Sequence, residues 1–341
     1  MSGIARDKEA AVGRRTWKQQ AWLLWALALT VAGPLQALAA DPLPSWNDGP
    51  VKQSIVDFVT RATTEGGPGY IPPEERIATF DNDGTLWQEQ PVVQGAFLLE
   101  QVRERVKEDA SLAKRQPFKA VLEGDVALLS AMDEPQLMEL FAATHAGKTQ
   151  DEFAREVRAF FQTARHPKLG VPYTQLAYAP MLELLQYLRA NGFQTWISSG
   201  GGVDFMRAVS EDTYDIPPQQ VIGSSLKEKF DEGNGNPVLR REARVDHLND
   251  KAGKPVGIDQ HIGRRPVFAA GNVRSGGDIQ MLQYTKEQPH PGFALLINHD
   301  DAEREFAYAE KNDASLKAAR QGGWTVVSMR QDWKRIFPEG R

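Results

Sequence analysis

The sequence predicts an α/β fold in which a parallel β-sheet is covered by helices on both faces, with an all-helical block inserted into it. Three observations support this prediction. Short apolar runs typical of buried strands recur along the chain. Amphipathic helical patterns lie between them, which indicates parallel strands joined by helices. From residue 90 to about residue 175 the pattern is helical and contains no convincing strand.

The individual elements follow from apolar periodicity and from the glycines and prolines that interrupt it. Strands are expected at residues 77–80, 193–197, 266–270, 293–298 and 324–329. Helices outside the helical block are expected at residues 51–62, 181–188, 279–284 and 303–319. Residues 231–236 are expected to form the turn of a β-hairpin or flap. Within the helical block, Thr149 and Glu152 have the spacing of a capping box, which predicts a helix start.

Residues 1–40 are predicted to be an export signal and not part of the fold. A basic region with Arg14 and Arg15 precedes the apolar run 21–32, and small residues at 37–40 suit cleavage. The run is too short to span a bilayer comfortably, although an uncleaved anchor is the alternative. Residues 14–17 weakly resemble a twin-arginine signal. We therefore expect a periplasmic or secreted protein, exported by the Sec or the twin-arginine route, with no stable membrane anchor after cleavage.

The composition excludes several classes of protein. The 341 residues include no cysteine, which removes disulfides, thiolate zinc sites and cysteine nucleophiles. Residues 1–40 contain five basic and two acidic residues of the 40 and 45 in the chain, so the remainder has 35 basic and 43 acidic residues, a net charge of −8. This balance argues against an extended nucleic-acid-binding surface. A small anionic substrate remains compatible, because it responds to the local charge of its site.

Two carboxylates follow the first predicted strand. Asp81 and Asp83 lie at the carboxyl end of that strand, where open α/β sheets usually place their chemistry. Burying two like charges side by side is unfavourable unless a cation or a substrate compensates them. Asp81 could attack phosphorus and form an aspartyl-phosphate, while Asp83 could protonate the leaving group and then deprotonate water. Gly84 would let the chain turn away sharply.

Three later segments also place polar groups near strand ends. Ser199 and the glycines that begin at Gly200 predict an anion site, because a hydroxyl and unobstructed amides can hold phosphate oxygens. Lys254 would offset negative charge near a phosphoryl group. Asn272 and Asp278 could supply oxygen ligands to a magnesium ion. Each segment also has an ordinary interpretation, namely a common glycine-rich turn, a solvated lysine and a helix cap.

The order of these segments resembles that of the haloacid dehalogenase superfamily. Its four ordered motifs are similar to these residues of the chain: Asp81, Asp83, Gly84 and Thr85; Ser199; Lys254; and Asn272 with Asp278. The helical block lies between the first two motifs, as in the phosphoserine-phosphatase-like branch. The resemblance extends from about residue 50 to the C-terminus. It implies a Rossmann-like core formed by residues 41–89 and 178–341, with a helical cap at residues 90–177.

The resemblance also implies a role for each site residue. Asp81 would be the nucleophile and Asp83 the general acid and base. The implied ligands of Mg²⁺ are Asp81, Asp83 through its backbone carbonyl, Asn272 and Asp278. The implied substrate-binding residues are Thr85, Glu89, Ser199, Gly200 and Lys254. Two positions depart from the family pattern, because Asn272 stands where an aspartate is usual, and Gln90 stands where a cap-entry glutamate is usual, with Glu89 one residue earlier.

We therefore expect an exported, magnesium-dependent phosphatase that acts on a small phosphorylated substrate and binds no nucleic acid. A phosphotransferase or a phosphonatase on the same scaffold is the alternative enzyme. A phosphonatase would need a cap lysine for a Schiff base, and Lys107, Lys114 and Lys119 are the candidates. A non-catalytic periplasmic binding protein is the alternative from another class, and the intact acidic pair argues against it.

Overall fold

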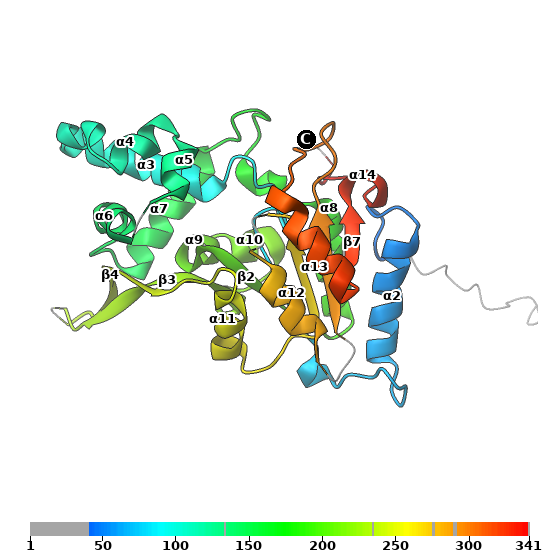
Figure 1. Ribbon diagram of the computed structural model, residues 1–341. Coiled ribbons are helices and arrows are strands. Elements are labelled where there is room, and N and C mark those ends of the chain that lie inside the picture. The colour runs from blue at the N-terminus through cyan, green and yellow to red at the C-terminus, as the bar shows by residue number, and fades with distance from the viewer. Residues whose placement is uncertain (1–40, 133, 234, 275–276, 289–291, 340–341) are drawn as a thin grey trace, which may run out of the picture. The chain divides into compact units, whose positions relative to one another are not determined.

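Seven strands form one sheet in the order β4-β3-β2-β1-β5-β6-β7 (Figure 1). The computed structural model describes residues 41–341 except 133, 234, 275–276, 289–291 and 340–341, so the export signal predicted at residues 1–40 lies outside the described part. The strands are β1 (Ile77–Phe80), β2 (Gln194–Gly202), β3 (Val221–Asp231), β4 (Val238–His247), β5 (Phe268–Asn272), β6 (Phe293–Asn298) and β7 (Thr325–Ser328). Neighbouring strands are parallel except β3 and β4, which are antiparallel. The predicted parallel α/β sheet is confirmed.

The two faces of the sheet contribute to two separate hydrophobic clusters, as β6 illustrates. Successive side chains of a strand point to opposite faces. Phe293, Leu295 and Ile297 belong to the larger cluster, while Ala294 and Leu296 belong to the smaller one. All five side chains are buried. A strand that is apolar at every position therefore requires cover on both faces, which is why its sequence is a continuous apolar run.

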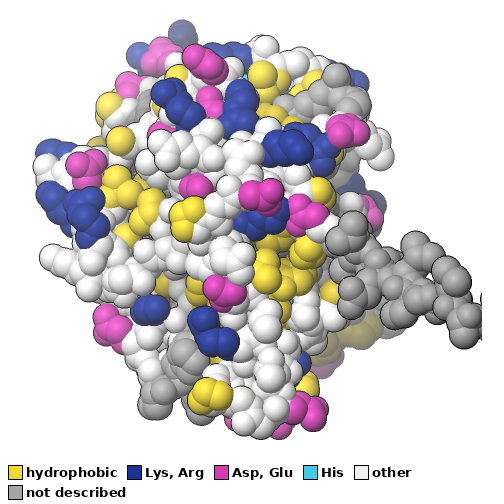
Figure 2. Space-filling model, turned by 90° about the vertical axis from the view of Figure 1, so that its right-hand side faces the viewer, with side chains coloured by type: hydrophobic (Ala, Val, Ile, Leu, Met, Phe, Trp, Pro, Cys, Tyr) yellow, Lys and Arg dark blue, Asp and Glu magenta, His cyan; other side chains and the backbone are white. Residues whose placement is uncertain are grey.

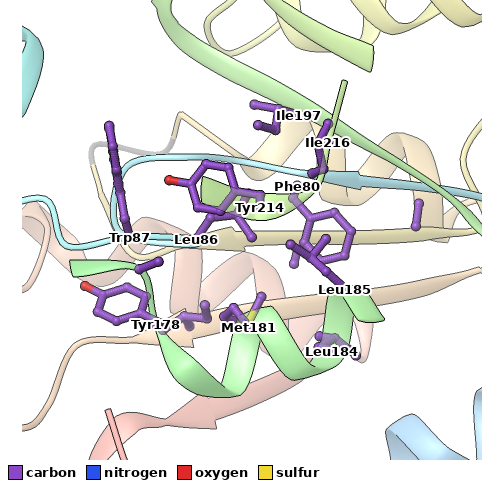
Figure 3. Close-up of a cluster of buried hydrophobic side chains, with 14 of the residues drawn as sticks. Phe80, Leu86, Trp87, Tyr178, Met181, Leu184, Leu185, Ile197, Tyr214 and Ile216 are labelled. Atoms are coloured by element: carbon purple, nitrogen blue, oxygen red, sulfur yellow. The ribbon is translucent and has the colours of Figure 1, made fainter. Parts of the chain in front are cut away.

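Helices supply this cover on both faces. The larger cluster includes residues of α2 (Pro50–Thr63), α8 (Ala179–Ala190), α9 (Val203–Arg207) and α10 (Ser210–Tyr214), and the smaller one includes residues of α11 (Gly253–Ile262), α12 (Ile279–Lys286) and α13 (Ala314–Gly322). Figure 3 shows Met181 and Leu185 of α8 gathered with Phe80 of β1 and with Leu86 in one buried group. The remaining short helices are α14 (Met329–Asp332), η1 (Pro73–Glu75), η3 (Tyr173–Leu176), η4 (Pro218–Gln220) and η5 (Lys311–Asp313).

The predicted helical block contains α3 (Val93–Glu108), η2 (Ala110–Lys114), α4 (Phe118–Glu123), α5 (Val126–Ser130), α6 (Glu134–Thr144) and α7 (Gln150–Thr163). The capping box is confirmed, because the Thr149 Oγ1 accepts from the Glu152 amide at 3.2 Å and Glu152 Oε2 accepts from the Thr149 amide at 2.8 Å. The block has a small core of its own around Val102 and Phe118. Phe97 and Phe153, however, pack into the larger cluster. Residues 42–341 form one compact unit, so the predicted division into core and cap remains a prediction.

The expected hairpin is present and is joined to the helical block. Strands β3 and β4 pair on either side of the predicted turn, with Asp231 opposite Val238. On its other side, β4 approaches the loop before α7, where the Gly147 amide donates to the Arg241 carbonyl at 2.9 Å and the Arg241 amide donates to the Lys148 carbonyl at 3.1 Å. The hairpin therefore connects the sheet edge to the helical block.

The helix predicted at residues 303–319 is wrong in its first half. The structure begins α13 only at Ala314, and residues 301–310 form no regular helix or strand. Arg304 donates through Nε to Asp301 and through its guanidinium nitrogens to the carbonyls of Met329 and Trp333. These contacts with distant residues outweigh the local helical pattern. Strand β2 also continues past the predicted end at residue 197, into the glycines that follow.

The surface and the helix lengths bear on the predicted partners. On the face seen in Figure 2, basic and acidic side chains are interspersed and do not gather by sign. In the described part of the chain, no helix combines the length and the apolarity that crossing a membrane requires. The expectation that the protein binds no nucleic acid remains a prediction.

Candidate active site

Eight of the nine predicted site residues line one cavity of about 140 Å³. They are Asp81, Asp83, Glu89, Ser199, Gly200, Lys254, Asn272 and Asp278. They meet because β1, β2 and β5 are neighbours in the sheet and end on the same edge. The ninth, Thr85, does not reach the cavity, since its side chain is fully buried and its Oγ1 lies 3.4 Å from Asn272 Nδ2. Thr85 is therefore placed to support Asn272, and its contact with a substrate remains a prediction.

Asp81 lies directly after β1 and is 8% exposed. Its amide donates to the Ala270 carbonyl of β5 at 2.9 Å, which fixes the backbone, and its Oδ1 accepts from Lys254 Nζ at 2.6 Å. Burial and the neighbouring Asp278 carboxylate raise the pKa of Asp81, while Lys254 lowers it. A cation close to Asp81 thus favours the ionised carboxylate, which is the form that a nucleophile needs.

Asp83 is held by the sharp turn that follows β1. Gly84 has a φ of 72°, and a Cβ there would lie 2.4 Å from Asn272 Nδ2, so this turn requires glycine. The Trp87 indole donates to Asp83 Oδ1 at 2.9 Å. Burial raises the pKa of Asp83, although the Trp87 hydrogen bond and the charge of Arg274 oppose it. A carboxyl that keeps its proton closer to neutral pH is suited to act as a general acid.

Lys254 connects the two sides of the cavity. Its ordinary interpretation from the sequence is a solvated lysine, but it is the second residue of α11 and only 2% exposed. Its Nζ lies 2.6 Å from Asp81 Oδ1 and 2.5 Å from Asp278 Oδ1. Burial lowers the pKa of Lys254, but the charges of the two carboxylates outweigh this effect and raise it above its usual value. Lys254 is therefore a permanent cation between two acids.

Asn272 and Asp278 are coupled across the turn after β5. The Asn272 amide donates to Asp278 Oδ2 at 2.9 Å, so both oxygens of Asp278 have protein donors. The side-chain Nδ2 of Asn272 donates to the Asp83 carbonyl at 2.5 Å, and its buried Oδ1 has no hydrogen-bond partner among the described residues. Metal ligation by Asp278 remains a prediction, and its contacts favour a role in holding Lys254.

The donors in the cavity fit a hard cation. Asn272 Oδ1 has no partner among the described residues. If the side-chain amide turned over, Oδ1 would take the position of Nδ2 beside the Asp83 carbonyl oxygen, and two oxygens would then face one point. Together with the Asp81 carboxylate, these are oxygen ligands of the kind Mg²⁺ prefers. The described residues hold no group of three or more His, Cys, Asp or Glu arranged for a metal, so a cation here depends on the amide and the carbonyl. Five acidic side chains and two basic ones line the cavity, which leaves an excess of negative charge.

Ser199 is placed as predicted, but the amides beside it are less available than predicted. Its Oγ accepts from the Gly201 amide at 3.1 Å, and the Gly202 amide donates to Gln94 Oε1 at 2.9 Å. Asn249 supports the turn by donating to the Ser199 carbonyl at 2.9 Å. The Ser199 hydroxyl hydrogen remains available for an anion, whereas two of the predicted backbone donors are already engaged.

Sequence reasoning missed two residues that control Glu89. Arg274 forms an ion pair with Glu89, and Tyr308 donates its hydroxyl to Glu89 Oε2 at 2.7 Å. Burial raises the pKa of Glu89, and the Arg274 charge opposes this shift. Arg274 could have been suspected from its place in the glycine-rich turn after β5. Tyr308 could not, because its segment was interpreted as a helix.

Comparisons with known proteins identify the family and the fold. A model of the haloacid dehalogenase-like hydrolase family matches residues 78–283. No curated protein matches. A protein of unknown function from Anaerococcus prevotii is similar in structure, with a TM-score of 0.54 and 16% identity over 85% of this chain and 96% of that one, which shows a shared fold. A protein of unknown function from Bordetella pertussis has a TM-score of 0.47, 14% identity and coverages of 74% and 98%. A phosphoserine phosphohydrolase-like protein from Francisella tularensis has a TM-score of 0.38, 15% identity and coverages of 74% and 94%.

Proposed function

Because this chain belongs to the haloacid dehalogenase-like hydrolases, we propose that it hydrolyses small phosphate monoesters with Mg²⁺, through an aspartyl-phosphate on Asp81. The observation that carries the proposal is the position of Lys254, whose Nζ contacts both Asp81 and Asp278 in the cavity that Ser199 also lines. A carboxylate nucleophile, a fixed cation and a hydroxyl donor thus surround one space that can hold a phosphoryl group.

The first step would transfer the phosphoryl group to the protein. A carboxylate oxygen of Asp81 attacks phosphorus, and the bond from phosphorus to the ester oxygen breaks. Asp83 gives its proton to that oxygen, which leaves as the alcohol. The raised pKa of Asp83 favours the protonated form that this step needs.

The second step would return the protein to its starting state. Water attacks phosphorus, the bond to Asp81 breaks, and the now ionised Asp83 takes the proton of the water. Inorganic phosphate leaves, with Asp81 ionised and Asp83 protonated again. In both steps Lys254 and the Ser199 hydroxyl would stabilise charge on the phosphoryl oxygens that are not transferred.

A bound Mg²⁺ would supply positive charge to the phosphoryl oxygens and to the acidic cavity. The Asp81 carboxylate, the Asp83 carbonyl and Asn272 Oδ1 are the groups that would hold it. We also propose that the helical block acts as a cap that excludes bulk water, and that residues 1–40 direct export to the periplasm or beyond. N-terminal sequencing of the protein from a periplasmic fraction would test the export, and a chain that retains residues 1–40 there would contradict cleavage.

Phosphate release from para-nitrophenyl phosphate, with Mg²⁺ and with a chelator, tests the function. We expect turnover that needs the metal and that Asp81→Asn reduces by roughly a thousandfold or more, because the nucleophile is lost. Asp212→Asn, which changes an exposed aspartate outside the cavity, is the matched control and should keep full activity. Full activity in a folded Asp81→Asn protein would overturn the proposal.

The alternatives differ in what the same assay would show. The three lysines that a phosphonatase could use do not line the cavity, and Lys107 pairs with Glu104 at the surface, so the geometry does not favour that reaction. A phosphotransferase would pass the phosphoryl group to an added alcohol in place of water. A binding protein would show no turnover at all.

A further inference from the structure

A second cavity of about 390 Å³ adjoins the catalytic one. Gly200 and Gly201, at the end of β2, line both cavities and form their common wall. The second cavity lies where helices α3, α6 and α7 approach β3 and β4, a group of elements that Figure 1 shows on one side of the molecule. Its volume is in the range of small-molecule sites.

The walls of this cavity are mainly apolar. Phe97 of α3, Phe141 of α6, Phe153 of α7 and Phe205 of α9 line it, and the hairpin adds Leu226. The aromatic rings contact one another, with centroids of Phe97 and Phe153 separated by 5.7 Å and those of Phe97 and Phe205 by 5.4 Å. Such a surface gains free energy when an apolar group displaces water from it.

The ionisable groups of this cavity leave no charge for a charged ligand to pair with. Asp204 accepts from the buried guanidinium of Arg241 at 2.7 Å. His145 is half-buried between Phe141 and Phe153, and this desolvation together with the charges of Lys148 and Arg241 lowers its pKa to about 4. The imidazole is therefore neutral at physiological pH. The terminal guanidinium nitrogens of Arg241 have no hydrogen-bond partner in the described part of the chain, but Arg241 does not line the cavity. A second phosphate, a carboxylate or an ammonium group would therefore meet no unpaired charge on the cavity walls.

One polar group at the border of the two cavities lacks a partner. Gln94 of α3 accepts from the Gly202 amide through Oε1, while its buried Nε2 has no hydrogen-bond partner in the described part of the chain. This nitrogen lies against the common wall, since a Cβ on Gly201 would be 2.1 Å from it. It is placed to donate to an oxygen of a ligand that extends from one cavity into the other.

Two carboxylates of the catalytic cavity could pair with the ammonium group of an amino-acid substrate. Asp250 has no ion pair in the described part of the chain and could hold such a group. Glu89 is engaged by Arg274 and Tyr308. An ammonium group would have to displace both contacts of Glu89. The preference for an uncharged, apolar group at the end away from the phosphate therefore rests on the walls of the second cavity.

We propose that the second cavity binds the alcohol part of the substrate, and that this alcohol is uncharged and carries an aromatic or similarly bulky apolar group. This inference rests on the proposed phosphatase function. It selects, among phosphate monoesters, those of apolar alcohols over those of small polar or zwitterionic ones such as phosphoserine.

A series of esters with alkyl leaving groups tests the preference. Phenethyl phosphate, ethyl phosphate and phosphoserine are compared, so that the intrinsic reactivity of the leaving group changes little while the apolar contact changes greatly. We expect kcat/KM for phenethyl phosphate to exceed that for ethyl phosphate by on the order of a hundredfold, from burial of the ring. Equal values for the two, or a preference for phosphoserine, would overturn the inference.

Gly95 is an exposed residue that lines the cavity, and a large side chain there offers a way to obstruct it. It lines the cavity from the first turn of α3, and a Cβ there meets nothing within 4 Å. Gly95→Trp should remove the preference for phenethyl phosphate and leave ethyl phosphate within a few-fold of the wild type, while Gly95→Ala is the matched control and should keep the preference. A folded Gly95→Trp protein that retains the preference would contradict the proposal. If this variant does not fold, the ester series on the wild-type chain still tests the proposal.

A binding measurement separates failure of this inference from failure of the phosphatase function. Phenethyl alcohol is titrated into the wild-type chain and into Gly95→Trp, and binding is followed by NMR. If no ester is hydrolysed, the proposed function fails, and the cavity is judged by this titration alone. Binding that Gly95→Trp weakens by tenfold or more supports an apolar alcohol site, and equal binding or none overturns it.

Discussion

The two adjoining cavities share a wall but are built by opposite means. Asp81, Asn272 and Lys254 of the catalytic cavity come from the ends of two adjacent strands and the first turn of a helix that packs on the sheet. The apolar cavity is formed by three helices of the helical block, by the β3–β4 hairpin and by α9. Charged groups need fixed mutual positions, which a sheet edge supplies, whereas an apolar wall needs only shape. Chemistry and selectivity are thus carried by different parts of the chain.

Replacing Lys254 should have the largest effect and should not depend on the alcohol. In Lys254→Met, Asp81 and Asp278 lose the cation between them, and we expect activity on every ester to fall by roughly a thousandfold or more. Lys317→Met, at an exposed position of α13, is the control for loss of a lysine charge. Phosphate release from both aryl and alkyl esters is measured. A loss confined to apolar esters would show that the two cavities are not divided as described.

Replacing Asp83 should discriminate between leaving groups. In Asp83→Asn no carboxyl proton is available for the departing oxygen. The kcat of the variant on phenethyl phosphate should therefore fall by on the order of a hundredfold to ten-thousandfold, and its kcat on para-nitrophenyl phosphate should fall much less. The pH dependence follows in sign from the raised pKa of Asp83. The wild type needs the protonated form, so its rate on the alkyl ester should fall as pH rises through that pKa, and Asp83→Asn should lack this limb. Equal losses for both esters would argue against an acid role.

Replacing Asn272 should have the smallest effect, and its main effect should be on metal affinity. Asn272→Asp adds a negative ligand, and we expect the Mg²⁺ concentration for half-activation to fall by about tenfold while the preference among esters stays unchanged. Calorimetric titration with Mg²⁺ in the absence of substrate provides a readout that does not depend on turnover. Asn272→Ala is the complementary variant and should raise the same concentration. Unchanged metal affinity in both would remove Asn272 from the proposed ligands.

Much of the catalytic cavity could be predicted because its residues adjoin strands that are obvious in the sequence. Asp81 and Asn272 follow or end continuous apolar runs, and parallel strands bring their carboxyl ends together. The burial of Lys254 could not be predicted, because it depends on contact with Asp81, 173 positions away. Thr85 was expected to bind substrate because it belongs to the motif, but the turn at Gly84 buries it.

The apolar cavity was beyond prediction for a related reason. Its aromatic residues belong to four separate helices, and in the sequence each one has the periodicity of an ordinary core residue. Tyr308 was likewise hidden, since the pattern of residues 303–319 predicts a helix while Arg304 holds the segment in an irregular conformation. The apolar periodicity of a sequence indicates which residues are buried, but only the tertiary structure shows which of the buried residues line a cavity.

The backbone pairing between β4 and the loop before α7 has a mechanical consequence. β3 pairs with β2 only as far as Ser224, and beyond that point it pairs with β4 alone. Arg241 of β4 is joined to Gly147 and Lys148 by two backbone hydrogen bonds. If the helical block lifts away from the sheet to admit a bulky alcohol, the outer hairpin must travel with it, bending near Ser224. The entrance for the alcohol would then open by a joint movement of the helical block and the hairpin. The phosphate site at the ends of the central strands would stay in place.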